Sequence, residues 1–174
     1  MSYGDALQRW HDFYVTAGAA AATLVGLLFV GLSLHIRAVV SHSDIRSLAR
    51  VTLTNFFVVL LIALVVLAPM SDPPATAAWL IGVAAVSLGL VFRPAIQGFR
   101  VRRSRTIGLG VLISRFGLSA LCYVGLGIAG VLFGRQDFDD GLSGLLIVVV
   151  FLLVIAVRNT WDLLVTVAAR PAAK

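Results

Sequence analysis

The sequence contains no glutamate and only one lysine, and charged residues make up only 13% of its 174 residues. A water-soluble domain of this length needs a polar coat, which so few charged side chains cannot supply. Hydrophobic residues account for 60% of the chain, and its mean hydropathy is +1.01. The composition therefore predicts an integral membrane protein.

The sequence also lacks the groups that most enzymes and metalloproteins need. Cys122 is the only cysteine, which excludes an intramolecular disulfide. The three histidines, His11, His35 and His42, have no spacing that would build a metal site. GxSxG, HExxH and CxxC motifs and phosphate-binding loops are absent from the sequence. We therefore expect a protein that is not an enzyme, with no cofactor and no metal.

Five apolar segments are long enough to cross a bilayer, which takes about 20 residues of helix. No linker, soluble domain or internal repeat divides them. The sequence therefore predicts an all-α fold, an integral membrane bundle of five transmembrane helices that forms a single transmembrane domain over residues 1–174. The predicted spans cover about 13–36, 47–69, 75–93, 107–133 and 142–162.

Capping and helix-breaking residues mark the ends of these segments. Proline restricts the backbone and removes a hydrogen-bond donor, whereas Ser, Asp and Gly favour caps and turns. The expected boundaries are a cap at Ser43 and Asp44, a turn at Pro69, Pro73 and Pro74, an end or kink at Arg93–Pro94, and a turn at Asp139, Asp140 and Gly141.

The positive charges alternate between the two sides of the predicted bundle. The first connection carries three arginines and the third carries five, whereas the second carries none and the fourth carries only Arg135, beside three aspartates. Loops rich in arginine stay in the cytoplasm. Five spans then require the N-terminus outside and the C-terminus inside.

The third connection holds the densest basic cluster, RVRRSR. A basic cluster next to a membrane span attracts anionic lipid headgroups, and no folded domain accompanies it that could read nucleic-acid bases. We therefore expect contact with anionic lipids of the cytoplasmic face, and no nucleic acid. The expected lipid contacts are Arg100, Arg102, Arg103 and Arg105.

Arg158, Asn159 and Asp162 interrupt the last apolar run. From Leu142 to Val157 a helix covers roughly 24 Å, short of a hydrocarbon core of about 30 Å, so the span is expected to continue to Trp161. The arginine side chain can then reach back to the inner surface and pair with Asp162, four residues on. We interpret these residues as the exit of the helix from the membrane.

The same residues allow a second interpretation, because the polar groups within the spans gather toward the cytoplasmic side. Arg115 would lie about 12 Å deep counted from Ile107, but at the interface counted back from Phe133. The alternative is a polar vestibule that opens to the cytoplasm. Its lining would comprise Asn55, Arg115, Arg158, Asn159 and Asp162.

Small residues recur every four positions in several spans, a spacing that lets helix backbones approach closely. The third span repeats the spacing at Ala85 and Gly89. Packing within one chain is favoured over contact between chains. The expected helix-packing residues are Gly18, Ala22 and Gly26 in the first span and Gly125, Ala129, Gly130 and Gly134 in the fourth.

The first span, HDFYVTAGAAAATLVGLLFVGLSLH, resembles the N-terminal span of a group of uncharacterised small bacterial multi-span membrane proteins, with the pattern F-Y-x-x-x-G-x-A-x-A-T-L-x-G-L-L-F-V. The resemblance covers one helix of the five. It implies a bacterial inner-membrane protein and implies nothing about mechanism.

Together these features favour a non-enzymatic integral membrane protein that acts by assembly. It would be a homo-oligomer or a small subunit of a larger membrane complex, so the expected partners are the bilayer and another membrane protein. The alternative is an oligomeric channel or carrier for a small ion. An anion would be favoured, because arginines outnumber carboxylates.

Overall fold

The computed structural model describes residues 3–41, 43–68, 72–101 and 117–168, without the side chains of residues 38, 43, 44, 92–101, 167 and 168. In these residues the chain forms six helices and no strand, so the all-α prediction is confirmed. The helices are α1 (Tyr3–Leu34), α2 (Ile36–Ser41), α3 (Ser43–Leu67), α4 (Pro73–Val101), α6 (Leu118–Gly134) and α7 (Phe138–Ala168).

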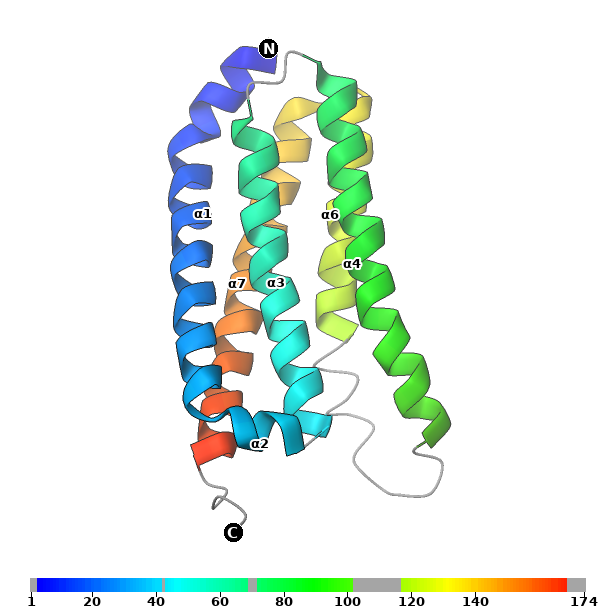
Figure 1. Cartoon of the computed structure of the whole chain (residues 1–174). Helices are drawn as coiled ribbons and strands as arrows, with labels where there is room; N and C mark the ends of the chain where they lie inside the picture. The colour runs from blue at the N-terminus through cyan, green and yellow to red at the C-terminus, as the bar shows by residue number, and fades with distance from the viewer. Residues whose placement is uncertain (1–2, 42, 69–71, 102–116, 169–174) are drawn as a thin grey trace.

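The five long helices lie side by side, and each runs opposite to the one before it (Figure 1). The N- and C-termini therefore lie at opposite ends of the bundle. The short helix α2 crosses the end at which α1 finishes and α3 begins. This end also carries the last turns of α4 and α7.

The order of the helices in space differs from their order in the chain. α1 packs on α3, α3 on α7, α7 on α6 and α6 on α4, whereas the contact between α3 and α4 is much less extensive. The last helix of the chain therefore lies between α3 and α6. Buried aromatic and aliphatic side chains fill the spaces between these pairs, among them Tyr14, Phe56, Tyr123 and Phe133.

The outer surface of the bundle is also apolar. Large hydrophobic side chains are exposed on each of the long helices, including Phe29, Leu64, Val86, Leu121 and Phe151. By length and composition, α1, α3, α4 and α7 can each cross a membrane, whereas α6 is apolar but has 17 residues. A helix that is apolar on both its inner and its outer face suits a lipid environment.

Several helices extend beyond the spans predicted from hydropathy. α1 begins at Tyr3 rather than near residue 13, and α7 continues to Ala168 rather than ending near residue 162. The backbone hydrogen bonds of a helix form within the helix itself, so a helix can continue past its apolar segment. Part of the predicted fourth span, residues 107–116, lies outside the described residues; the rest matches α6.

The sequence predicted either an end or a kink of the third helix at Arg93–Pro94. An end there is wrong, because α4 continues to Val101; the kink stays a prediction. A proline removes one hydrogen bond from the helical ladder and crowds the carbonyl four residues earlier. The helical hydrogen bonds before and after the proline can still form. The turn expected at the prolines between the second and third spans does separate α3 from α4, and Pro73 takes the first helical position, where proline is favoured.

The turn before α7 lies earlier than predicted. Asp139 and Asp140 belong to the first turn of the helix, where negative charge interacts favourably with the helix dipole. The chain turns at residues 135–137, and Gln136 has a left-handed backbone with φ 67°. Gly141 is required by close packing, because a Cβ there would lie 2.8 Å from the Phe133 ring.

Candidate functional site

A small set of polar side chains is buried among the apolar residues of the bundle. Two of their four hydroxyl groups bond to their own helix: Thr52 donates to the carbonyl oxygen of Leu48, and Ser87 donates to that of Val83. Such bonds satisfy a hydroxyl without linking two helices. The buried polar residues are Thr52, Asn55, Thr76, Ser87, Ser119 and Asn159.

Asn55 forms the main polar link between helices. Its Nδ2 donates to Oγ of Ser119 at 3.0 Å, and the hydroxyl of Tyr123 donates to its Oδ1 at 2.5 Å. All three residues are fully buried. A side-chain amide that is bonded at both ends inside an apolar bundle holds α3 and α6 in a fixed register.

Sequence reasoning selected Asn55 but missed this partnership. Ser119 and Tyr123 are four residues apart and so share one face of α6. Two hydroxyl side chains on one face of an apolar helix are a signal that the face meets a polar group. The signal was present in the sequence, but it did not indicate which of the other helices carries that group.

A second polar contact lies at the opposite end of the bundle. The hydroxyls of Tyr3 and Thr76 lie 2.7 Å apart and link α1 to α4. The Tyr3 ring also packs on Phe138, with ring centroids 5.3 Å apart. Tyr14 donates its hydroxyl to the backbone carbonyl of Leu142, which adds a link from α1 to α7. These contacts hold the N-terminal half of α1 against α4 and α7.

The three α7 residues predicted to line the vestibule differ in exposure. Arg158 is exposed and Asp162 is half-buried, whereas Asn159 is only 4% exposed. By length and composition the candidate membrane span of α7 runs from Phe138 to Thr166 and includes all three. Their interpretation as the exit of the helix from the membrane stays a prediction.

Among the described residues of the predicted vestibule, Asn159 is the one with a buried polar atom that lacks a hydrogen-bond partner. Its Nδ2 is buried and has no hydrogen-bond partner among the described residues. Its neighbours Ala156 and Leu163 pack in the apolar cluster that includes Leu28 and Phe56. A buried amide without a partner costs about 1–3 kcal/mol.

The described members of the predicted vestibule do not share one open surface. Asn55 is buried and hydrogen-bonded to Ser119 and Tyr123. Asn159 is also buried, whereas Arg158 is exposed. Arg115 lies outside the described residues. Among the predicted lipid contacts, Arg102, Arg103 and Arg105 also lie outside them, and Arg100 belongs to the last turn of α4.

Most of the predicted packing glycines contact another helix of the same chain. A Cβ at Gly18 would lie 2.9 Å from Cβ of Ala63, and one at Gly125 would lie 3.1 Å from Cγ2 of Val148. Gly130 is tighter, because a Cβ there would meet Cγ1 of Ile81 at 2.8 Å and α4 backbone atoms at 3.3 Å. Gly134 faces Ala77, and Ala129 is buried.

Other small residues face outward. Ala22 and Gly26 are exposed on α1, and nothing lies within 4 Å of a Cβ built at Gly26. α4 has a longer row, spaced by four, three and four residues along one exposed face. We call it the α4 small-residue row; it comprises Ala78, Gly82, Ala85 and Gly89.

A Cβ at Gly82 or Gly89 would also meet nothing within 4 Å, so close packing inside the chain does not account for either glycine. Glycine in a helix interior costs about 1 kcal/mol relative to alanine. Comparison with known proteins does not supply an explanation: no protein-family model, no curated protein and no solved structure matches this chain.

Proposed function

We propose that the protein is a five-span membrane protein that acts by assembly, as a homo-oligomer or as a small subunit of a larger complex in the inner membrane of a bacterium. The observation that carries this proposal is the α4 small-residue row, which is exposed and has space around both of its glycines. In lipid, rows of small residues let helices approach closely enough for backbone packing.

The buried polar groups favour assembly of several chains rather than a pore through a single chain. The amide of Asn55 is hydrogen-bonded at both its nitrogen and its oxygen, and the surrounding helices are closely packed. A conducting path needs polar groups that line a continuous opening. Five helices around an apolar core offer no such lining in the described part of the chain, so partners would have to meet on the outer faces.

We expect Gly89→Leu to reduce the size of the assembly, because a leucine side chain would fill the space that a second helix needs. The control is Gly26→Leu, the same substitution at an equally open glycine on α1, which lies at the opposite edge of the bundle (Figure 1). Native mass spectrometry after gentle extraction would measure the mass of each variant. An unchanged mass for Gly89→Leu, or a parent protein that is monomeric and alone, would contradict the proposal.

The proposed orientation has the N-terminus outside and the C-terminus inside. It places α2 in the cytoplasm and the turn between α6 and α7 outside. In a Cys122→Ser background, we expect Gln136→Cys to react with a membrane-impermeant maleimide in intact cells and Arg37→Cys to react only after permeabilisation. Both positions are exposed, whereas Cys122 is buried. The reverse labelling pattern would overturn the orientation.

A further inference from the structure

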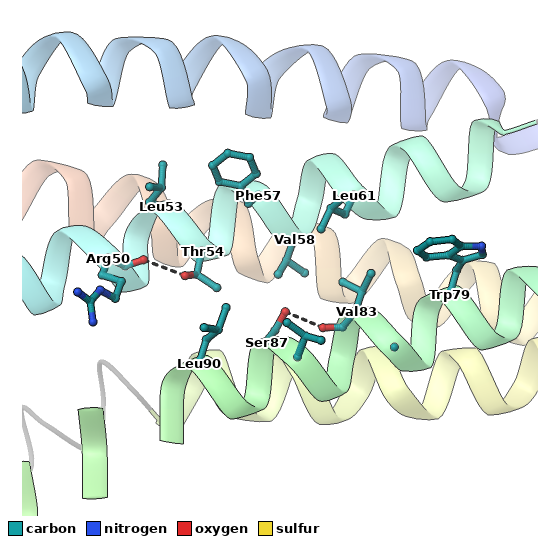
Figure 2. Close-up of a pocket in the computed structure, with 12 residues that line it drawn as sticks. Arg50, Leu53, Thr54, Phe57, Val58, Leu61, Trp79, Val83, Ser87 and Leu90 are labelled. Atoms are coloured by element: carbon teal, nitrogen blue, oxygen red, sulfur yellow. Dashed lines mark hydrogen bonds between the residues drawn. The ribbon is translucent and has the colours of Figure 1, made fainter. Parts of the chain in front are cut away.

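An apolar groove of about 450 Å³ runs along the outer surface between α3 and α4, where these two helices separate (Figure 2). Its volume falls within the range of about 300–1,000 Å³ that is typical of ligand sites. α3 supplies Leu53, Phe57 and Leu61 to one wall, and α4 supplies Val86 and Leu90 to the other.

The two hydroxyl groups in the groove are already bonded. Thr54 donates to the backbone carbonyl of Arg50 at 2.9 Å, and Ser87 donates to that of Val83 at 2.7 Å (Figure 2). The walls therefore offer no free hydroxyl hydrogen to a polar ligand. They suit an apolar chain, which gains from burial without needing directional bonds.

One end of the groove has a different chemistry. Among the described lining residues, Arg50 is the only charged one, and its guanidinium lies at the end opposite Trp79 (Figure 2). Arg46 lies one turn earlier on the same face of α3, and both side chains are exposed. No carboxylate is among the lining residues that the structure describes. Guanidinium groups bind phosphate oxygens in a two-pronged geometry.

The length of the groove fits one leaflet of a bilayer. From Arg50 to Leu61, α3 rises about 16 Å, which is roughly half of a hydrocarbon core about 30 Å thick. An acyl chain whose headgroup lies beside Arg50 would therefore follow the groove toward the middle of the membrane. Such a ligand has one charged end and one apolar end, as the groove does.

We propose that the α3–α4 groove binds an acyl chain of an anionic phospholipid and that Arg50 binds the phosphate of its headgroup. The lipid would come from the leaflet at the arginine-bearing end of α3. The proposal rests on insertion of the bundle in a membrane. It does not depend on assembly through the α4 small-residue row, although Gly82 of that row also lines the groove.

Fluorescence of Trp79, which lines the groove, provides the test. The full chain with Trp10→Phe and Trp161→Phe would be placed in phosphatidylcholine vesicles doped with phosphatidylglycerol, with bromine on the acyl chains of one lipid at a time. Quenching by brominated phosphatidylcholine checks insertion. We expect brominated phosphatidylglycerol to bind beside Trp79 about fivefold better than phosphatidylcholine, because an arginine near the surface attracts an anionic lipid.

Arg50→Gln should lower this preference to about one, and Thr54→Phe should do the same by filling the groove. Arg158→Gln is the matched control, since it removes an exposed arginine from α7 and should leave the preference unchanged. Equal quenching by the two lipids in the parent, or a preference that survives both groove variants, would overturn the proposal. A change in oligomer size for Thr54→Phe with the lipid preference intact would assign the groove to a second copy instead.

Discussion

Gly130→Leu is expected to separate α6 from α4 and to cost the bundle about 3 kcal/mol or more. Even a Cβ at this position would lie 2.8 Å from Cγ1 of Ile81 and 3.3 Å from the backbone of α4. The Ile81 side chain can shift, but the backbone atoms of Ala77 and Ile81 cannot move without moving the helix. Overpacking in a dense core typically costs about 1–3 kcal/mol, and leucine adds three carbons beyond the Cβ.

The loss would be measured as the decrease in the midpoint of thermal unfolding, followed by circular dichroism in a mild detergent. Gly26→Leu is the control, because it makes the same change in side chain and helix propensity at a glycine with nothing within 4 Å. Equal midpoints for the two variants would mean that the approach of α6 to α4 does not contribute to stability.

Asn55→Leu is expected to destabilise the bundle by about 2 kcal/mol. The change leaves the hydroxyl of Tyr123 without its acceptor and Oγ of Ser119 without the amide that donates to it, both fully buried. Leaving a buried polar group unpaired costs about 1–3 kcal/mol, although interhelical bonds in membranes contribute less on average. Denaturant-induced unfolding of the detergent-solubilised protein would measure the difference.

A double variant separates the lost bond from a general loss of packing. In Asn55→Leu with Tyr123→Phe, both partners of the shorter bond are removed, so the second change should cost much less than Tyr123→Phe alone. Additive effects of the two substitutions on the free energy of unfolding would show that the two side chains do not act as a pair. The hydrogen bond between α3 and α6 would then not contribute to the stability of the bundle.

The helices were predictable from the sequence because each predicted span contains a long apolar run. The ends of the helices were less predictable. Residues 3–12 contain Asp5, Arg9 and Asp12, which lower the hydropathy, yet α1 starts at Tyr3. The reason is tertiary: the hydroxyl of Tyr3 contacts Thr76, and its ring packs on Phe138. Hydropathy along one segment carries no information about such contacts.

The polar residues were recognised one by one, but not their arrangement. Asn55, Arg158 and Asn159 fall at similar predicted depths, which suggested one vestibule. The structure separates them because depth does not fix the rotation of a helix about its axis: Asn55 faces α6, Asn159 is buried and Arg158 faces outward. In the same way, equal spacing predicted one role for Gly26 and Gly130, whereas one faces open space and the other contacts α4.

The place of α7 between α3 and α6 also has a consequence for biosynthesis. The ribosome makes α3 and α6 before the helix that packs against both of them exists. Until α7 is made, core residues such as Phe56 and Leu126 lack part of their packing surface. A nascent chain that stops before Phe138 would therefore lack a complete core.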